Sequence, residues 1–393
     1  MSEGNQHIVS FVKEVTKGET PANPRFQLLP DNRTTINLTK ETLATERLSG
    51  NRFPSKSRTG ARQVSGEIPA DLSYGTYDSF IESALQGLFV EDVAGVDSVS
   101  IDIDDAGAVS FDEGDTYATA NGVITFETVN AIEQKLVAVY NPTVGDSINY
   151  VFEGLDTLTI DSEEFVIASF TNIAKSAVAK AGNTRSTFSI VREFSDLESA
   201  EKFLLYTGCE VGTWAITAEA NKIAKSTFTF MGLSMLDPSA SAPVGATFKP
   251  SIDNEPFDTF NGEMKVDGNA TCIVTSYNLT INNNLSTQFS VGCESARGTR
   301  AGQSVIEGSI TVFFETIDLY QKFIDEAQLA LELTLEDNLG NQMVISLPNL
   351  KITSGTNIDV SGDAEITLPI SFTAHEDIDL ASHISVKRIE RTA

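Results

Sequence analysis

Histidine is scarce in this sequence, and its scarcity excludes most of the common catalytic sites. The 393 residues include three histidines, which lie near the two ends of the chain: His7, His375 and His383. A Ser-His-Asp triad, a Cys-His pair or a histidine-based metal site needs these side chains beside other reactive groups, and no spacing here provides that. We therefore expect a protein that is not an enzyme and that has no cofactor.

Cysteine is equally rare. The chain contains Cys209, Cys272 and Cys293, an odd number without Cys-x-x-Cys spacing. This pattern argues against a disulfide framework or a zinc site and is typical of a reducing cytoplasm. One string that begins at Asp102 resembles a calcium loop, but Ala106 stands where a ligand belongs. A turn between two strands explains that string more simply.

Long hydrophobic runs are also missing. Every uninterrupted apolar run falls far short of the roughly 18 residues that cross a bilayer. The first five residues have neither the basic region nor the apolar core of a signal peptide. We expect no membrane association and no secretion. The hydrophobic content of 41% suits two or three separate cores.

Positive charge is scarce and unevenly distributed. The chain has 27 basic and 55 acidic residues, a formal net charge of -28. Residues 88–171 contain 17 carboxylates and one lysine, so 16 of these net negative charges lie in that segment and 12 in the rest. Such a field repels nucleic acid phosphates, and it excludes ordinary DNA or RNA binding by the body of the protein.

An internal repeat is the most informative feature that is present. Residues 36–84 are echoed by residues 277–327, with residue class kept along a strand, a loop, a strand and a helix. The matched positions are Gly60, Val64, Gly66 and Ile68 with Gly302, Ile306, Gly308 and Ile310, then Tyr77, Phe80, Ile81 and Ala84 with Tyr320, Phe323, Ile324 and Ala327. The sequence therefore predicts one fold used twice.

Each copy has the pattern of a strand followed by a helix. Residues 64–72 alternate between apolar and polar positions, as a half-buried strand does. The apolar positions from Tyr77 to Leu85 then form one helical stripe, and Gly87 lies where that helix would end. The second stripe follows Thr316 or Asp318 as the helix cap. Another alternating strand, around residues 225–230 and 366–372, is expected near the end of each copy.

The first copy is longer than the second, and its surplus contains the acidic segment. We therefore expect a mainly β protein with few helices and an inserted small β domain. The predicted domains are an N-terminal arm at 1–24, a first fold at 25–87 and 183–236, the acidic insert at 88–182, a proline-rich linker at 237–262, a second fold at 263–375 and a C-terminal tail at 376–393.

Two basic loops occupy matching places in the repeat. One interpretation is a solvated hairpin tip, and the other is contact with an acidic neighbour, which the presence of a loop in both copies favours. The basic residues are Arg52, Lys56, Arg58 and Arg62 in the first loop, Arg297 and Arg300 in the second, and Lys387 and Arg388 in the tail.

Taken in order along the chain, several stretches resemble the tail tube proteins of long-tailed bacteriophages, in the type with two tube folds in one chain. These stretches are residues 63–69 running into the helix at 74–85, residues 207–211 leading to 228–232, and residues 277–280 leading to 305–310. The resemblance implies two tandem folds, each a β sandwich or half-barrel with one flanking helix. Single-fold members form sixfold rings, so the resemblance implies a ring of three chains with pseudo-sixfold symmetry.

The resemblance also implies a role and partners. Rings would stack into the hollow tube of a long, non-contractile tail, which houses the tape measure protein and through which the genome leaves without specific binding. Further partners would be the tail tip and tail terminator proteins, and the chain would assemble in the cytoplasm of the bacterial host before it becomes part of the virion tail. The two basic loops and the tail would contact the adjacent ring. The expected lumen residues are Glu41, Glu46, Glu67 and Asp71.

Other readings remain open at this point. A baseplate or tail terminator component or a capsid decoration protein can reuse the same fold and would show the same repeat. An extracellular adhesin fits less well, because the chain has free cysteines and no signal sequence. A carbohydrate-active enzyme would need paired carboxylates beside a sugar-stacking aromatic platform, and neither is evident.

Overall fold

The structure is a computed structural model, and it is mainly β, as the sequence predicts. It describes residues 6–30, 33–43, 57–91, 98–102, 116–119, 122–130, 135–142, 157–160, 163–166, 175–197, 202–252, 254–314, 318–354, 366–378 and 380–390. Contacts divide the chain into a larger unit (1–89, 179–338 and 342–387) and a smaller unit (90–178, 339–341 and 388–393). Each unit is described by itself.

The larger unit contains two described helices and most of the strands. The helices are α1 (Asp78–Leu85) and α3 (Asp318–Ile324). The strands are β1 (His7–Lys13), β2 (Arg25–Leu28), β3 (Asn37–Leu43), β4 (Arg58–Asp71), β13 (Phe188–Phe194), β14 (Phe203–Glu219), β15 (Lys225–Gly232), β16 (Ser234–Met235), β17 (Thr247–Lys249), β18 (Asp258–Val266), β19 (Asn269–Thr271), β20 (Val274–Asn282), β21 (Ser286–Gln288), β22 (Gly298–Arg300), β23 (Val305–Phe313), β24 (Gln328–Glu336), β25 (Gln342–Ser354) and β26 (Thr367–Ala374). The division between the units falls inside β12 (Lys175–Lys180) and β27 (Ser385–Glu390).

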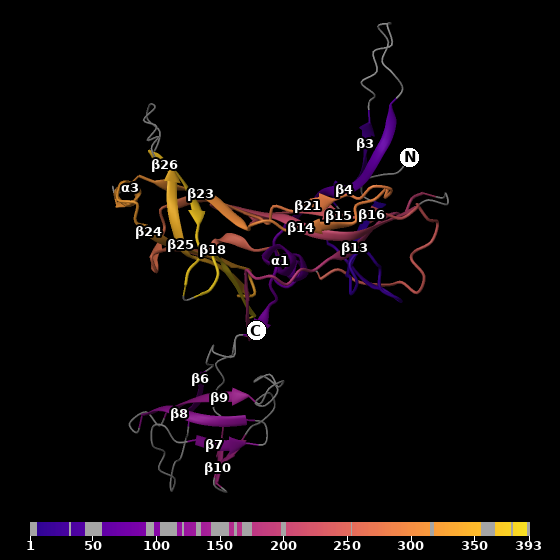
Figure 1. Ribbon diagram of the computed structural model, residues 1–393. Coiled ribbons are helices and arrows are strands. Elements are labelled where there is room, and N and C mark those ends of the chain that lie inside the picture. Colours follow the sequence, from indigo (N-terminus) through magenta and orange to yellow (C-terminus); the bar gives the residue numbers. More distant parts are fainter. Residues whose placement is uncertain are drawn as a thin grey trace. The chain divides into compact units, whose positions relative to one another are not determined.

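One antiparallel series of strands runs through the whole larger unit. Its order is β3, β4, β15, β14, β20, β23, β26, β25, β24, β18 and β19. The long strand β14 also begins a branch, because its first half pairs with β13, which continues to β1 and β2. Figure 1 shows β14 and β23 within one layer, from which the hairpin of β3 and β4 projects as an arm.

The same strand registers occur twice along this series. Phe230 of β15 lies opposite Gly66 of β4, and Phe372 of β26 lies opposite Gly308 of β23. Both glycines are required by close packing, because a Cβ at either position would overlap neighbouring atoms. The glycines that the repeat aligns therefore have the same structural role in both copies.

Irregularities in the strands also recur. In β14 the register against β15 shifts between Val211 and Thr213, and in β25 the register against β26 shifts between Ile352 and Ser354. The hairpins β13–β14 and β24–β25 have matching shifts as well, between Phe188 and Ile190 in one and between Leu329 and Leu331 in the other. Because a bulge inserts a residue at a defined place, such repetition indicates equivalent geometry. The exact domain limits given by the sequence stay a prediction.

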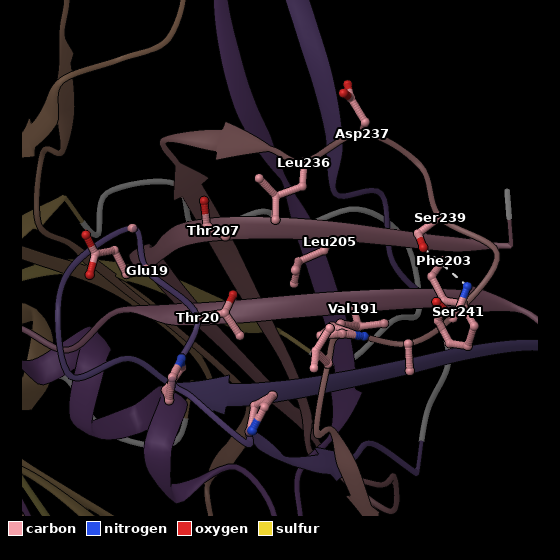
Figure 2. Close-up of a pocket in the computed structure, with 16 residues that line it drawn as sticks. Glu19, Thr20, Val191, Phe203, Leu205, Thr207, Leu236, Asp237, Ser239 and Ser241 are labelled. Atoms are coloured by element: carbon pink, nitrogen blue, oxygen red, sulfur yellow. Dashed lines mark hydrogen bonds between the residues drawn. The ribbon is translucent and has the colours of Figure 1, made fainter.

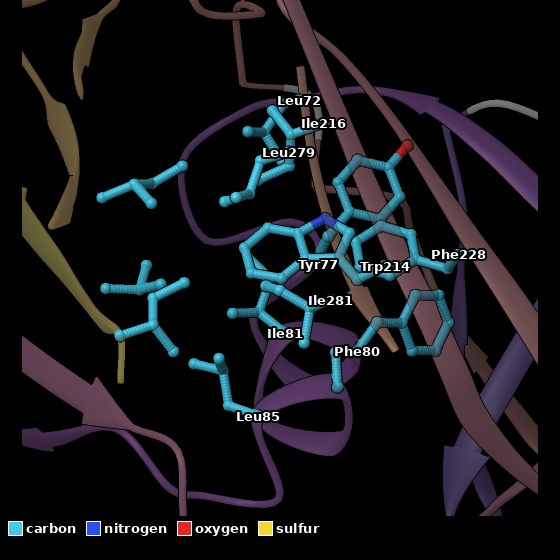
Figure 3. Packing of buried hydrophobic residues seen from close by; sticks show 14 of the residues in the cluster. Leu72, Tyr77, Phe80, Ile81, Leu85, Trp214, Ile216, Phe228, Leu279 and Ile281 are labelled. Carbon is cyan, nitrogen blue, oxygen red and sulfur yellow. The ribbon is translucent and has the colours of Figure 1, made fainter. Parts of the chain in front are cut away.

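Helix α1 packs its whole apolar stripe into the main core. Tyr77, Phe80, Ile81, Ala84 and Leu85 are all buried, as the sequence predicts. Figure 3 shows the other four, without Ala84, against side chains of β14, β15 and β20. These side chains are Trp214, Ile216, Phe228, Leu279 and Ile281. The rings of Trp214 and Phe228 are stacked with centroids 5.9 Å apart. Aromatic packing of this kind contributes beyond its buried area.

The end of α1 differs from the sequence prediction in one detail. The residue in the left-handed conformation after the helix is Gln86, with φ of 51°, and not Gly87. Gly87 is needed for another reason, because a Cβ there would overlap the carbonyl oxygen of Lys180. The helix therefore ends at the predicted position, but the residue with the left-handed conformation at its end is Gln86 rather than Gly87.

The first and last segments of the larger unit also contain strands. Residues 7–13, within the predicted N-terminal arm, form β1, where Val9 and Phe11 are buried in the core. Near the C-terminus, Ile384 and Val386 are buried on either side of the start of β27. The alternation of apolar and polar residues in each segment explains why it pairs with a sheet.

The smaller unit contains short antiparallel strands. A four-stranded sheet has the order β6 (Ser98–Asp102), β9 (Lys135–Pro142), β8 (Gly122–Asn130) and β7 (Thr116–Thr119). A separate hairpin joins β10 (Thr157–Ile160) to β11 (Glu163–Val166), and β5 (Val90–Glu91) pairs with β12. The described part of the acidic segment therefore consists of β-strands, as expected for a small β domain.

Candidate assembly surfaces

The two repeat copies are joined by direct strand pairing. Along β14, residues 213–219 pair antiparallel with residues 276–282 of β20, so the sheet of one copy continues into the next. At this junction Trp214 lies opposite Ile281 on one side and Phe228 on the other. Helix α1 covers the same place, and its Ala84 carbonyl accepts a hydrogen bond of 2.7 Å from Asn283. The junction therefore combines paired strand edges with a helix packed over them.

Counterparts of the elements on the two sides of this junction occur elsewhere in the larger unit. By register, β3 is the counterpart of β20, and the second half of β25 is the counterpart of β14. Among the described residues β3 pairs along one edge only, with β4. Helix α3, the counterpart of α1, leaves Ile324 55% exposed, although the matching Ile81 is fully buried. An unpaired strand edge and an uncovered apolar helix face are both sites for association.

The face of the sheet opposite the core is polar and mostly uncharged. Residues that lie directly opposite each other on neighbouring strands point to the same face. One such row crosses the sheet through hydroxyl, amide and a few charged side chains: Asp71, Lys225, Thr217, Asn278, Ser309, Ser371 and Ser354. The next row contains Pro69, Thr227, Ala215, Thr280, Glu307, Thr373 and Lys351.

A buried ionic cluster connects the two copies beside the junction. The Glu210 side chain is only 1% exposed. Arg185 donates two hydrogen bonds of 2.6 Å to its two carboxylate oxygens, and Lys17 and Thr299 contact Oε2 at 3.1 and 2.7 Å. Burial alone would raise the pKa of Glu210, but the hydrogen bonds from Arg185 and Thr299 and the charges of Lys17 and Arg185 outweigh it and lower that pKa. The cluster links the N-terminal segment, β14 and β22.

A second buried carboxylate anchors the N-terminal segment, with no cation bound to it among the described residues. Glu14 accepts four hydrogen bonds, from the Gly18 and Gly208 amides at 2.7 and 2.8 Å and from the Thr187 and Ser189 hydroxyls at 2.8 Å. A buried charge is tolerated where hydrogen bonds satisfy it in this way. Together with the cluster around Glu210, this site fixes the turn at residues 14–20 to β13 and β14.

The structure places the predicted contact residues in several environments. Arg62 lies in β4 and pairs at 3.0 Å with Glu294 of the second basic loop, so the two loops meet within one chain. Arg58 is exposed on the arm, and Arg297 and Arg300 are exposed beside and within β22. Lys387 and Arg388 are half-buried in β27, while Arg52 and Lys56 lie outside the described residues. Contact with another ring stays a prediction for all of them.

The predicted lumen residues can be placed in part. Glu67 is exposed, and Asp71 is half-buried; both lie on the polar face, because the intervening Ile68 and Ala70 point into the core. Glu41 is exposed on β3 next to a register shift, and Glu46 lies outside the described residues. Two of the four positions therefore share a face of the sheet.

Sequence reasoning missed the cluster around Glu210. A signal was present, because Glu210 stands between Cys209 and Val211 in a run that is otherwise apolar or hydroxylic, and both neighbours are buried. A carboxylate inside such a strand needs a partner. Its partners Lys17, Arg185 and Thr299 are distant in the sequence, so the pattern gives no indication of which residues they are.

No arrangement typical of a metal site occurs in the part of the chain that the structure describes. Neither described helix is long and apolar enough to span a bilayer. The described surfaces are thus strand edges, a polar face and an exposed helix side.

Comparison with known proteins identifies a family for this chain. No curated protein matches the sequence. The model of the family described as phage tail tube protein matches residues 4–374, nearly the whole chain. The chain belongs to the phage tail tube protein family.

Proposed function

We propose that this chain is the major tube subunit of a long, non-contractile bacteriophage tail, with a structural rather than an enzymatic role. Three chains would form a ring, and rings would stack into the hollow tube. The family supports a component of the virion tail. The number of chains in a ring and the stacking are what the resemblance to single-fold tube proteins implies, and the direct pairing of the two copies supports the ring.

The junction between the two copies carries the proposal. Within the chain, the β14 edge of one copy pairs with the β20 edge of the other over seven residues. If the same pairing occurred between chains, β3 of one subunit would lie beside the end of β25 of the next subunit. The sheet that contains β3 would then cover Ile324 of α3 in that next subunit. Repetition of one junction by rotation closes a ring and pairs the open edge of β3. Three chains with two copies each give the sixfold arrangement of single-fold tube proteins.

The polar face is the natural candidate for the inner wall of the ring. It has Asn278 and Thr280 exposed, with carboxylates such as Glu67 and Glu307 and the cation Lys225 among them. Hydroxyl and amide groups hold phosphates weakly when no cluster of basic residues assists them. DNA would therefore pass without specific binding, and the tape measure protein would occupy the same channel before ejection.

Other partners follow from the position of a tube in a tail. The first and last rings would meet the tail tip and tail terminator proteins, and assembly would take place in the host cytoplasm. These contacts would involve the same ring surfaces that join one tube ring to the next.

Negative-stain electron microscopy of the purified chain at rising concentration tests the proposal. We expect rings or hollow rods, formed by the chain alone or after addition of the cognate tail-tip complex as initiator. A chain that stays monomeric under both conditions would contradict the proposed function. Threefold end views with six similar lobes would support the arrangement of two copies in each chain.

A further inference from the structure

The arm formed by β3 and β4 extends beyond the strand that supports it. In the sheet, β15 pairs with β4 along residues 64–71, so it leaves the same edge of β4 uncovered along residues 58–63. On the other strand of the arm, every residue from 39 to 43 is exposed. A two-stranded ribbon without further packing is only marginally stable in water. The arm therefore depends on other contacts at its root to keep one direction.

A loop of the second copy supplies such a contact at this edge of β4. The loop lies between β21 and β22, and its Ser295 forms a parallel bridge with Arg62 of β4. The Arg62 amide donates a hydrogen bond of 2.8 Å to the Glu294 carbonyl, and the Arg62 guanidinium pairs with the Glu294 carboxylate at 3.0 Å. The Thr287 hydroxyl also donates to the side-chain oxygen of Gln63 at 3.2 Å. The sheet therefore gains a short third strand at the root of the arm.

The charges of the arm and the loop suit this contact. Residues 40–62 contain six basic and two acidic side chains, in a chain of net charge -28. Glu294 is the one carboxylate among residues 286–300, and it faces Arg62. An exposed ion pair of this kind is weak by itself. The backbone hydrogen bond and the strand bridge therefore carry most of the contact, and the ion pair adds to it.

The loop is itself fixed to the body of the larger unit. Its base is paired, because residues 286–288 of β21 lie opposite residues 298–300 of β22. Thr299 is buried, and its hydroxyl donates a hydrogen bond of 2.7 Å to Glu210. Arg185 donates to the Thr299 carbonyl at 3.1 Å. The loop thus connects the buried ionic cluster at its base to the root of the arm.

The N-terminal turn completes this anchor. Lys17, which belongs to the turn at residues 14–20, contacts Glu210 in the same cluster. Figure 2 shows Thr20 of that turn beside Leu205 of β14. A hydrogen bond of 2.8 Å fixes the Thr20 hydroxyl to β13. The base of the loop is therefore held by a turn that is itself bonded to the sheet.

We propose that the loop at residues 289–297 is a brace that fixes the direction of the β3–β4 arm within its own chain. The loops of the two copies occupy matching places in the repeat but have different roles, because the first extends as the arm and the second holds the root of that arm. Glu294 and Ser295 are the positioning residues. The inference concerns the single chain, so it goes beyond the proposed function and is tested without rings.

Hydrogen exchange of the monomer, followed by mass spectrometry, tests the brace. In one variant residues 289–297 are replaced by Asn-Gly, which closes the β21–β22 hairpin with a two-residue turn and keeps Thr299 in place. We expect the amides of residues 38–43 and 58–63 to exchange about tenfold faster than in the wild type, because the third strand is lost. The amides of residues 64–71, which β15 covers, should keep their protection.

Charge variants test the same contact without shortening the loop. Glu294→Arg brings two cations together and should speed the exchange of the arm amides by about threefold. Glu294→Arg combined with Arg62→Glu should restore most of the protection. The matched control is Arg297→Glu, which reverses an exposed charge in the same loop and should leave the exchange unchanged.

The protection of residues 64–71 and the unfolding temperature check that each variant is folded. Arm amides that exchange equally fast in the wild type and in the shortened variant would overturn the brace. A double variant that exchanges as fast as Glu294→Arg alone would also overturn it, and the charge variants decide the question where the shortened loop does not fold. Neither result affects the proposed function, whose test is the formation of rings.

Discussion

The two helices of the repeat have the same pattern and different surroundings. Ile81 of α1 is fully buried, whereas the matching Ile324 of α3 is 55% exposed. The difference is not in the sequence of the helices but in what lies beside them. Helix α1 sits where the first copy meets the second, and α3 sits where the second copy meets no other in the same chain. The junction beside α1 is therefore complete within one chain, whereas the equivalent site beside α3 has an exposed apolar side chain.

The strand beside each helix differs in a corresponding way. Glu210 of β14 and Lys351 of β25 occupy equivalent register positions. Glu210 is buried among Arg185, Lys17 and Thr299, while Lys351 forms an exposed pair with Glu326. The buried cluster ties the complete junction to the N-terminal segment, and nothing comparable fixes the open one among the described residues.

The largest effect is expected at the complete junction. Ile81→Ala removes a fully buried side chain from the core beneath α1, and it should lower the free energy of unfolding of the monomer by about 2–5 kcal/mol. Chemical denaturation at a concentration below assembly measures it. A loss under about 1 kcal/mol would show that α1 does not depend on this packing, contrary to the large-to-small substitution costs of buried sites.

Glu210→Gln should have the next largest effect. It leaves the guanidinium of Arg185 and the ammonium of Lys17 without their carboxylate, at a cost of about 2 kcal/mol because both cations retain some access to water. Folding lowers the pKa of Glu210 from an ordinary value of 4.5. Its contribution is therefore present above that value and is lost as the pH falls through the lower folded pKa.

Urea denaturation at several pH values measures this effect. The difference in unfolding free energy between wild type and Glu210→Gln should be largest near neutral pH and should shrink below pH 4.5. The matched control is Lys351→Gln at the equivalent exposed position, which should leave stability unchanged. A difference that stays constant down to low pH would contradict the ionic role of Glu210.

Ile324→Ala sharpens the comparison between the helices. Because Ile324 is exposed in the monomer, its removal should change monomer stability by less than about 0.5 kcal/mol. The variant should nevertheless need more protein to form rings, since the side chain would be covered by the next chain. Sedimentation velocity distinguishes the two states. Ring formation identical to that of the wild type would place α3 outside the interface between chains.

The smallest effect on the fold is expected from the basic loops. Arg58→Glu combined with Arg297→Glu changes two exposed side chains, so the monomer should keep its unfolding temperature. Stacking of rings should weaken, and electron microscopy would show shorter rods. Rods of normal length from this variant would remove these two arginines from the contact between rings.

Periodicity predicted much of the fold, because it reports which side chains enter a core. The apolar stripe from Tyr77 to Leu85 became the buried face of α1, and Phe228 and Phe230 became core residues of β15. Residues 7–13 lie in the predicted N-terminal arm and form β1, and the alternation that buries Val9 and Phe11 is typical of a strand.

The assembly surfaces could be predicted only in part. Pairing of β14 with β20 uses backbone groups, which every residue but proline supplies, so no side-chain pattern specifies that partner. The ionic cluster joins Lys17, Arg185, Glu210 and Thr299 from four separate segments. Contacts between segments that are distant in the sequence depend on the folded topology. A sequence pattern therefore does not show which of these segments lie together.

Native mass spectrometry of the smallest closed assembly tests the central claim, that the junction between copies is repeated between chains. The account predicts a ring of three chains, each of 42.4 kDa, with no stable dimer. A ring of six chains, or a closed dimer, would contradict it, because either would require the open edge of β3 and the exposed side of α3 to find partners other than the equivalents of β14 and β20.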